Sequence, residues 1–400
     1  MRVVIIGNGL AGTMAAKTLR ELSSDVEIVE FAAETHPYYP RPNLIEFLAG
    51  NLPPERLFAF PADWNRKSRI DVRLGRAVEN ILPETREILI AGGGREPYDA
   101  LLVANGSSAS VPPIRGADKK GVFTLKTLDD ASAILEYLDG HPRVALIGGG
   151  VLGLEIARAL TLRGAQVTVV EFYDRLLPRQ LDPEGAALLK VQIERLGIAV
   201  RLQAATEEIL GEGEARGLRL KGGEEIPADM VIVAAGVKPN LEMARAAGLT
   251  VERGIVVDDF LATSRPGIYA AGDVVQHRGR LYGIIPAAFD QARAAAYNIL
   301  GETKPYQGSV VSSTLKVVGL YLTSVGTVLP EGPGFEELRR EDKEKGLYKK
   351  IVLKDGVLAG AIWMGTKKGV MEISRAVASA KNVGARGEAL LDEAFDFAQI

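Results

Sequence analysis

The chain has 400 residues, of which 47% are hydrophobic and 25% are charged. A chain of this length usually divides its core, so we expect a globular protein of two or three domains. The formal net charge of -3 excludes the basic excess typical of nucleic-acid binding, and no apolar run is long enough to suggest a membrane span.

Cysteine is absent from the sequence. Disulfides, thiolate nucleophiles, Cys-ligated zinc and Cys-ligated iron–sulfur clusters are therefore excluded. The three histidines, His36, His141 and His277, stand far apart and match no metal-binding spacing, so we expect no metal site. Any redox chemistry must come from a bound cofactor.

The N-terminal residues predict a strand, a glycine turn and a helix. The apolar run Val3–Ile6 leads into Gly7-Asn8-Gly9-Leu10-Ala11-Gly12, and Thr13–Leu22 favours a helix. Because the apolar run is far shorter than that of a signal peptide, we read it as a strand and expect a cytoplasmic protein.

A second predicted strand, Val26–Glu30, places Glu30 18 residues after Gly12. In the G-x-G-x-x-G pattern, Gly7, Gly9 and Gly12 allow a tight turn, a close approach of a pyrophosphate and close helix packing. The helix N-terminus favours the phosphates, and Glu30 would accept hydrogen bonds from a ribose. The first unit therefore predicts a dinucleotide site.

The same pattern returns 141 residues later, where Val144–Gly153 repeats Val3–Gly12. A predicted helix, Leu154–Arg163, and a predicted strand, Val167–Glu171, complete the second copy. Its candidate binding residues are the loop and its acid: Gly148, Gly150, Val151, Leu152, Gly153 and Glu171. An acid at this point binds a free ribose 2′-hydroxyl and repels a 2′-phosphate, which favours NADH over NADPH, although Arg175 stands nearby.

The remaining segments complete the predicted fold. Tyr98–Gly106 and Ala228–Gly236 are predicted strands, and Gly267–Asp273 returns late in the sequence to the first domain. After Gly301 we expect a small α+β domain. Its elements would be a β-rich stretch at Ser312–Val328, a hairpin at Ile351–Trp363, a helix at Met371–Ala380 and a solvated charged face at Glu337–Lys345.

The predicted class is α/β, with two Rossmann-like dinucleotide-binding domains and a small C-terminal α+β domain. The boundaries that we expect are 1–113 with 238–304 for the first domain, 114–237 for the second and 305–400 for the third. Val111–Gly116, rich in proline and glycine, would form the first crossing between domains.

Together these motifs resemble the FAD-dependent pyridine nucleotide-disulfide oxidoreductases, over essentially the whole chain. The resemblance implies that FAD lies in the first site and NAD(H) in the second. It also implies FAD contacts near Leu10, Ala11, Arg41, Pro42, Val78, Ala104, Asn105, Gly106, Gly272 and Asp273, and an NAD(H) contact near Gly236. Asn105 stands where relatives usually carry a threonine.

Two further residues are candidate catalytic residues by this resemblance. Glu155 matches a glutamate near the flavin–nicotinamide junction of relatives, although an ordinary helix N-terminal acid would look the same. Arg41 belongs to Tyr39-Pro40-Arg41-Pro42-Asn43-Leu44, where disulfide reductases carry cysteines. This stretch resembles rubredoxin reductases, ferredoxin reductases and the flavoprotein part of NADH-nitrite reductases.

The sequence therefore predicts an enzyme that passes hydride from NADH to FAD and then electrons to a protein acceptor. The expected acceptors are rubredoxin, a ferredoxin or a metalloenzyme partner subunit. Three alternatives stay open: an NADH oxidase that reduces oxygen, an NADH-port subunit of a larger oxidoreductase, and a flavin-based redox sensor.

Overall fold

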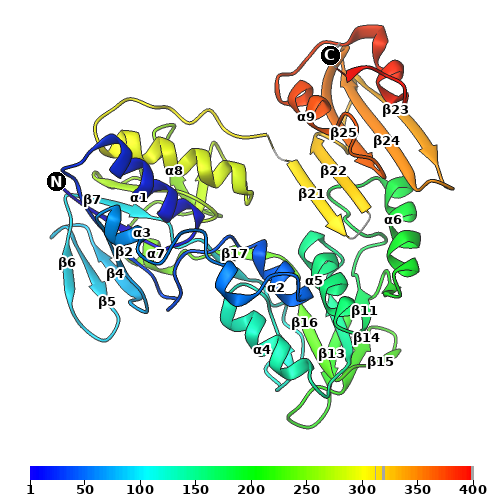
Figure 1. Cartoon of the computed structure of the whole chain (residues 1–400), viewed down its shortest axis with the longest axis horizontal. Coiled ribbons are helices and arrows are strands. Elements are labelled where there is room, and N and C mark those ends of the chain that lie inside the picture. Colours follow the sequence, from blue (N-terminus) through cyan, green and yellow to red (C-terminus); the bar gives the residue numbers. More distant parts are fainter. Residues whose placement is uncertain (311, 318–319, 398–400) are drawn as a thin grey trace. The chain divides into compact units, whose positions relative to one another are not determined.

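The computed structural model describes residues 1–310, 312–317 and 320–397 and divides into two compact units (Figure 1). The first unit comprises Met1–Asn43, Leu52–Ser108 and Val237–Ser309. The second comprises Leu44–Asn51, Ala109–Gly236 and Val310–Ile400. Residues 311, 318, 319 and 398–400 of the predicted C-terminal domain lie outside the described residues.

The first unit is built on a five-stranded sheet in the order β19-β7-β1-β2-β3, whose neighbouring strands are parallel. Its strands are β1 (Arg2–Ile6), β2 (Glu27–Phe31), β3 (Ile70–Arg73), β7 (Ala100–Val103) and β19 (Ile268–Ala270). The β7 strand is buried at all four positions, as expected for a parallel sheet covered on both faces. The late return of Gly267–Asp273 to the first sheet is therefore confirmed.

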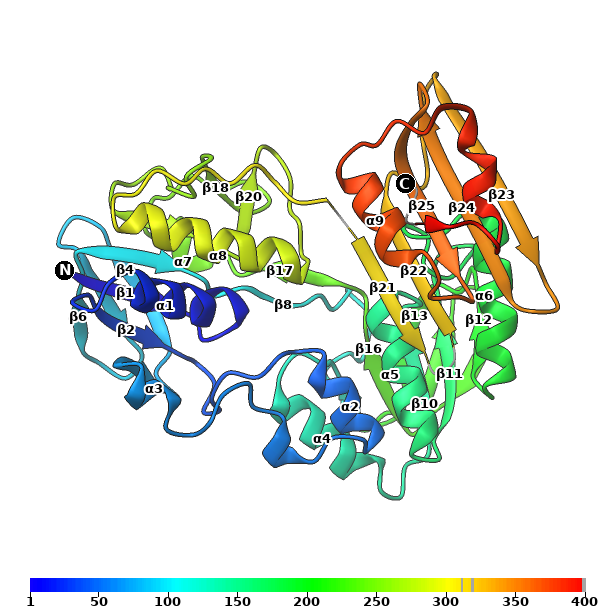
Figure 2. The ribbon, with the colours of Figure 1, turned by 45° about the horizontal axis from the view of Figure 1, so that its top comes forward.

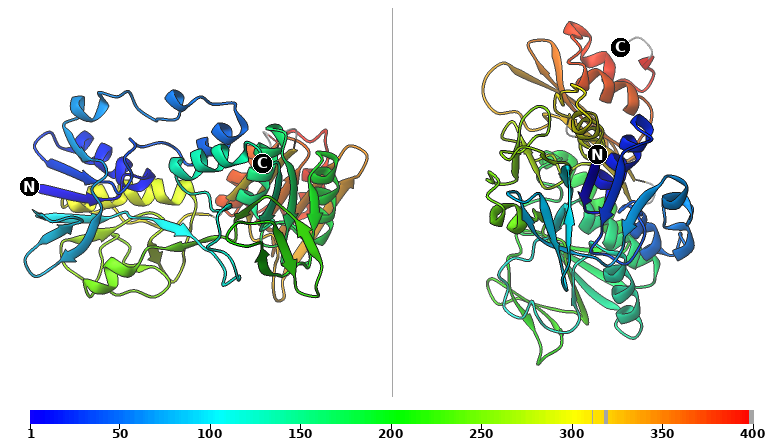
Figure 3. Two further views of the ribbon diagram at one scale, coloured as in Figure 1. Left: turned by 90° about the horizontal axis from the view of Figure 1, so that it is seen from below. Right: turned by 90° about the vertical axis from the view of Figure 1, so that its left-hand side faces the viewer.

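The helices of the first unit include α1 (Leu10–Leu22) and α8 (Ile285–Ile299), which pack side by side in each view (Figures 1 and 3). The shorter helices are η1 (Pro54–Arg56), α3 (Trp64–Lys67) and α7 (Glu242–Ala246). Smaller sheets join β4 (Val78–Leu82), β5 (Glu87–Ile90) and β6 (Arg95–Pro97); β8 (Ser107–Ala109) and β17 (Val237–Pro239); and β18 (Ile255–Val257) and β20 (Val275–His277).

The second unit repeats this plan with a parallel sheet in the order β12-β11-β10-β16-β9. Its strands are β9 (Val122–Phe123), β10 (Arg143–Ile147), β11 (Gln166–Val170), β12 (Ala199–Arg201) and β16 (Met230–Val233). Its helices are α2 (Asn43–Ala49), which begins at the unit boundary, α4 (Leu128–Leu138), α5 (Val151–Leu162) and α6 (Pro183–Arg195).

The duplication extends to a detail that the glycine motifs do not show. The small sheet of β13 (Thr206–Leu210), β14 (Gly217–Leu220) and β15 (Glu225–Pro227) corresponds to β4–β6 of the first unit. Both sheets have a register shift in the first strand, between Val78 and Asn80 and between Thr206 and Glu208. Each unit is therefore a variant of one α/β plan, as the repeated sequence predicts.

The C-terminal part of the second unit is an antiparallel sheet with one longer helix (Figure 2). The strand order β21-β22-β25-β24-β23 joins β21 (Ser312–Val317), β22 (Leu320–Gly326), β23 (Phe335–Asp342), β24 (Leu347–Lys354) and β25 (Val357–Met364). The helices are α9 (Val370–Ala378), η2 (Gly384–Arg386) and η3 (Glu388–Leu391). The β24–β25 hairpin and α9 confirm the predicted hairpin and helix.

A buried charge cluster joins α6 to this sheet. Asp182, the N-cap of α6, accepts hydrogen bonds from the Gly185 N–H at 3.1 Å and the Tyr348 hydroxyl at 2.6 Å, and pairs with Lys350 Nζ at 3.0 Å. The Lys350 ammonium also lies 2.9 Å from a Glu337 oxygen. Burial alone would raise the pKa of Asp182, but the bonds from Tyr348 and Lys350 lower it.

None of the helices in the described part of the chain combines the length and apolar character that a membrane crossing requires.

Candidate functional site

The first glycine loop connects β1 to α1 and touches the end of β7. Gly7 has φ +111°, and a Cβ there would lie 2.3 Å from the Ala104 carbonyl oxygen. A Cβ on Gly12 would lie 1.8 Å from the Gly7 carbonyl oxygen. Both glycines are therefore fixed by close backbone packing, and the Ala104 carbonyl lies against the loop.

Gly9 differs from these two glycines, because a Cβ there would meet no atom of the described residues within 4 Å. It is the N-cap of α1, where backbone N–H groups lack intrahelical partners, and Leu10 and Ala11 form the first turn. Open space at a helix N-terminus fits an anionic pyrophosphate.

Glu30 lies in β2 beside this loop and is fully buried. Within the described residues, neither of its carboxylate oxygens has a hydrogen-bond partner. Burial raises the pKa of Glu30 to about 8, and the neighbouring Thr13 hydroxyl acts in the opposite direction. Because a buried carboxylate without partners is costly, this position fits the hydroxyl groups of a ribose, which would donate to it.

Gly272 and Asp273 lie against the same loop. A Cβ on Gly272 would come within 3.0 Å of the Ala11 Cβ, and the Gly272 N–H donates to Gln291 Oε1 at 2.8 Å. The Ser107 hydroxyl donates to Asp273 Oδ2 at 2.8 Å. The chain thus gathers residues from its beginning, middle and late segments around one glycine loop.

Asn105, the departure from the usual threonine, exchanges hydrogen bonds with Asn240. Each side-chain amide donates to the other residue's carbonyl oxygen, at 3.1 Å from Asn105 and 2.8 Å from Asn240. The Asn105 Oδ1 is buried without a partner among the described residues. Asn105 therefore ties two distant segments together beside Gly106, which has φ +63°.

Arg41 is held by neighbouring side chains of its own segment. Its guanidinium bonds the Glu34 carboxylate and the Tyr39 hydroxyl and lies 4.6 Å from the centre of the Tyr39 ring. Burial would lower the pKa of Arg41, but the bonds to Glu34 outweigh it and raise the pKa. Pro42 is exposed and Val78 is partly buried against the core of the first unit.

The second glycine loop repeats the geometry of the first. A Cβ on Gly148, at φ +117°, would lie 2.5 Å from the Ala234 carbonyl oxygen, and a Cβ on Gly153 would lie 2.1 Å from the Gly148 carbonyl oxygen. Gly150 is the N-cap of α5 and, like Gly9, faces open space. Val151 and Leu152 begin α5, with Leu152 exposed, and Gly236 has φ +100° after β16.

Glu171 is buried like Glu30 but has partners. Its carboxylate accepts the Gly149 N–H at 2.6 Å and the Tyr173 N–H at 2.8 Å. A carboxylate still has lone pairs for ribose hydroxyls after two such bonds. The acid of the second site, Glu171, therefore has hydrogen-bond partners in the protein before any ligand binds.

Arg175 is occupied by local contacts. Its guanidinium pairs with Asp174 at 2.9 Å and donates to the Leu181 and Pro178 carbonyl oxygens, each at 3.4 Å. These contacts hold it in its own loop. Glu155 lies partly buried in α5, five residues after the N-cap Gly150 and beyond the first turn, which holds no acid. The interpretation of Glu155 as an ordinary acid of the first helical turn, stabilised by the dipole, is therefore wrong.

Sequence reasoning missed the residues that support the first site: Thr13, Ser107, Asn240 and Gln291. Ser107, Asn240 and Gln291 have partners in other segments of the chain, so no local pattern marks them. Thr13 directly follows Gly12 and donates to Asn8 within the glycine motif, so its place beside the motif was an available signal. Among the described residues, no group of histidines and acids could hold a metal ion.

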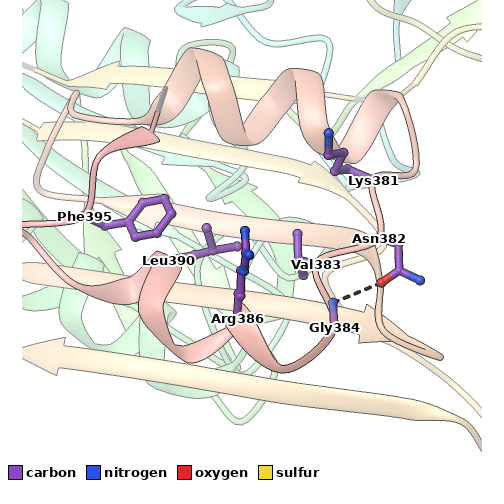
Figure 4. A pocket seen from close by; sticks show the side chains of 7 residues that line it. All are labelled: Lys381, Asn382, Val383, Gly384, Arg386, Leu390 and Phe395. Carbon is purple, nitrogen blue, oxygen red and sulfur yellow. Dashed lines mark hydrogen bonds between the residues drawn. The ribbon is translucent and has the colours of Figure 1, made fainter. Parts of the chain in front are cut away.

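A hollow of about 290 Å³ in the C-terminal part does not involve the glycine loops (Figure 4). Its lining residues are Lys381, Asn382, Val383, Gly384, Arg386, Leu390 and Phe395. The Asn382 Oδ1 accepts a hydrogen bond from the Gly384 N–H at 3.0 Å, drawn as a dashed line in Figure 4. The candidate site is therefore the pair of glycine loops.

Comparisons with known proteins agree with this geometry. Residues 1–295 match the pyridine nucleotide-disulphide oxidoreductase family, and residues 312–381 match the rubredoxin NAD+ reductase C-terminal domain. The chain is 37% identical to a nitrite reductase [NAD(P)H] of Bacillus subtilis, over 91% of this chain and 45% of the relative. It therefore spans about half the length of that curated relative.

Other relatives match along their whole length. An NADH-rubredoxin oxidoreductase of Clostridium acetobutylicum is 30% identical, over 95% of both chains. The crystal structure of a ferredoxin reductase from Rhodopseudomonas palustris has a TM-score of 0.90 at 28% identity and covers 100% of this chain and 99% of its own. On these grounds, the chain belongs to the pyridine nucleotide-disulphide oxidoreductase family.

Proposed function

We propose that this protein is an FAD-dependent reductase that takes a hydride from NADH and passes electrons to a one-electron carrier protein, such as a rubredoxin or a ferredoxin. One observation carries the proposal. Two complete dinucleotide loops lie in a chain without cysteine, and among the described residues the buried acid of the first, Glu30, lacks the hydrogen-bond partners that the acid of the second, Glu171, has. We expect a permanently bound cofactor at the first loop, because its hydroxyl groups would supply the hydrogen bonds that the Glu30 carboxylate lacks.

FAD fits the first loop, and its bound isoalloxazine supplies the redox chemistry, because a flavin accepts a hydride and can release electrons singly. In this proposal Glu30 accepts from the ribose and the N–H groups of the Gly9–Gly12 turn bind the pyrophosphate. Asp273, whose carboxylate accepts a hydrogen bond from the Ser107 hydroxyl, would contact the same cofactor. Arg41, fixed on Glu34, places a positive charge in the first unit at a constant position.

NADH fits the second loop. The N–H groups at Gly150–Gly153 would bind its pyrophosphate, and Glu171 would accept hydrogen bonds from a ribose. Glu155 and Gly236 are further residues of this unit that would contact the bound cofactor. A 2′-phosphate would be repelled by the Glu171 carboxylate, which cannot move aside without losing its two backbone hydrogen bonds. Arg175 is paired within its own loop and is not positioned to bind a 2′-phosphate. Both contacts support a preference for NADH over NADPH.

The protein acceptor is supported by two relatives whose names include rubredoxin or ferredoxin and by the match of residues 312–381 to a rubredoxin reductase domain. The proposal also places the protein in the cytoplasm, where NADH is formed. The test is NADH-dependent reduction of cytochrome c with and without added rubredoxin or ferredoxin. Reduction that needs neither carrier would contradict the proposal.

A second candidate is an electron-input subunit of a larger oxidoreductase. It is favoured because the chain covers only 45% of the nitrite reductase and 47% of an assimilatory nitrate reductase electron transfer subunit, both of Bacillus subtilis. Purification from its own cells decides between the two. A stoichiometric redox partner would favour the subunit, whereas a free flavoprotein active with soluble carriers would favour the reductase.

A further inference from the structure

The helix α2 is an excursion of the chain from the first unit to the second. Residues up to Asn43 belong to the first unit, Leu44–Asn51 belong to the second, and the chain returns at Leu52. The crossing directly follows Arg41 and Pro42, the stretch that the sequence places at the FAD. A change in the position of α2 would therefore be transmitted to this stretch through only two or three peptide bonds.

The segment before the crossing is fixed on the first unit. Arg41 is paired with Glu34, and the Asn43 side-chain amide donates to the Leu57 carbonyl oxygen at 3.1 Å. The Asn43 N–H donates to the Pro40 carbonyl oxygen at 2.9 Å. These hydrogen bonds hold Tyr39–Asn43 in a defined conformation on the first unit. The chain passes to the second unit directly after Asn43.

The helix beyond the crossing is fixed on the second unit by two apolar side chains and one cation. Leu44 and Leu48 are buried, with exposures of 2% and 0%. Arg163 Nε donates to the Leu48 carbonyl oxygen at 2.9 Å, and its Nη2 lies 3.4 Å from the Phe47 carbonyl oxygen. Because α2 has no basic residue in its own last turn, Arg163 supplies the cation that its C-terminal carbonyl groups favour.

Gly50 shows how closely this contact is packed. A Cβ at Gly50 would lie 3.0 Å from the Arg163 Cζ, and the residue has φ +82°. The guanidinium therefore lies against the turn that ends α2, as well as on its carbonyl groups.

Arg163 is also the C-cap of α5, the helix whose N-terminus is the second glycine loop. A straight helix of this length is rigid and spans about 18 Å. The dinucleotide loop and the Arg163 contact are therefore opposite ends of one rigid element (Figures 1 and 2).

We propose that Arg163 is a positioning residue for flavin reduction: it couples occupancy of the nicotinamide site on α5 to the conformation of Tyr39–Asn43 through α2. The inference rests on the proposed function. No group on Arg163 reacts, and its effect passes through α2 alone.

The first test measures hydrogen exchange in FAD-loaded protein with and without NAD+, which binds without reducing the flavin. In the native protein, NAD+ should slow exchange at the Tyr39, Arg41 and Asn43 amides, which lie in the other unit. Arg163→Ala should abolish this response while protection at the second glycine loop remains. Arg195→Ala, which removes an exposed arginine at the end of α6, is the matched control and should respond like the native protein.

The second test follows anaerobic flavin reduction by NADH in a rapid-mixing experiment. We expect Arg163→Ala to lower the limiting rate about tenfold with little change in the NADH concentration at half-saturation. Arg163→Lys, which keeps one donor, should restore part of the rate. If Arg163→Ala proves too unstable, Arg163→Lys carries the test alone, with a smaller loss of rate and a weaker exchange response.

The proposal is overturned if the Tyr39–Asn43 amides respond to NAD+ equally in both Arg163 variants and the native protein, or if the limiting rate is unchanged. A native protein whose flavin NADH does not reduce would instead contradict the proposed function, and the exchange experiment would still decide the role of Arg163.

Discussion

Glu30 and Glu171 occupy equivalent places 141 residues apart, Glu30 near the end of β2 and Glu171 directly after β11, yet their hydrogen bonding differs. Glu30 has no partner in the described structure, whereas Glu171 accepts two backbone N–H groups. The difference has a local cause. A Cβ at Gly149 would lie 3.0 Å from the Glu171 carboxylate, and the first copy has a side chain, Asn8, at the matching position.

The two buried acids let one α/β plan serve two kinds of ligand. A site whose buried carboxylate is satisfied only by the ligand favours permanent occupancy, because the free protein bears the cost of the empty site. A site that satisfies its own carboxylate can be vacated and refilled in each turnover. We therefore assign the resident cofactor to the first loop and the exchanging one to the second.

The largest expected effect tests the packing role of the loop glycines. Gly7→Ala should prevent formation of the first site, since the new Cβ would collide with the Ala104 carbonyl oxygen and Gly7 has positive φ. Gly9→Ala should leave the fold intact and weaken FAD binding, because its Cβ points to open space. Thermal unfolding and bound flavin per chain separate the two. Equal loss of stability in both variants would contradict the assignment.

The next effect concerns the second unit, whose stability depends on its own charges. Lys350→Met should lower the free energy of unfolding by about 3–5 kcal/mol, because it leaves the buried Asp182 carboxylate without its ammonium partner. The matched control is Lys354→Met, which removes an exposed lysine of the same strand and should cost little. Denaturant unfolding measures the free energy of unfolding of both variants. Similar decreases in the two would show that the Asp182–Lys350 pair does not contribute to stability.

The buried Glu30 carboxyl makes the stability of the apoprotein depend on pH. In the apoprotein the pKa of Glu30 is about 8, above the ordinary 4.5, so the folded chain holds a proton that the unfolded chain loses. The free energy of unfolding should therefore fall as pH rises from about 4.5 to about 8, by an amount on the order of a few kcal/mol. FAD binding to the ionised form should release a proton, so affinity should rise with pH over the same window.

Glu30→Gln tests this prediction, because glutamine stays neutral over the whole range from about pH 4.5 to about pH 8. The variant's apoprotein should lose most of that pH dependence and bind FAD more weakly. Urea unfolding and flavin titration at pH values below and above 8 provide the measurement. A native apoprotein with flat stability across this range would show that Glu30 is not protonated when the site is empty.

The smallest effect tests the second acid directly. Glu171→Arg should reverse or abolish the preference for NADH, a change of about tenfold or more in the ratio of kcat/KM values for NADH and NADPH. The matched control, Arg175→Ala, should change the ratio little, because Arg175 is engaged within its own loop. An unchanged ratio in Glu171→Arg would remove the assigned role of Glu171.

The glycine spacing predicted much of the fold and the core of both sites, because a tight turn with close backbone contact leaves few residue types possible at Gly7, Gly12, Gly148 and Gly153. The different states of Glu30 and Glu171 could not be predicted, since both follow the same local pattern. The Asn105–Asn240 exchange and the Asp182–Lys350 pair join residues far apart in sequence, so only the folded chain shows them.

Electron transfer from NADH through the flavin to a carrier is measured by reducing the purified protein with one equivalent of NADH under argon, admitting air and timing the return of the oxidised flavin spectrum. We predict rapid reduction by NADH and slow return in air, followed by rapid reoxidation when a rubredoxin or ferredoxin is added. Fast return in air without a carrier would indicate an oxidase. Absence of flavin, or of its reduction by NADH, would contradict the account.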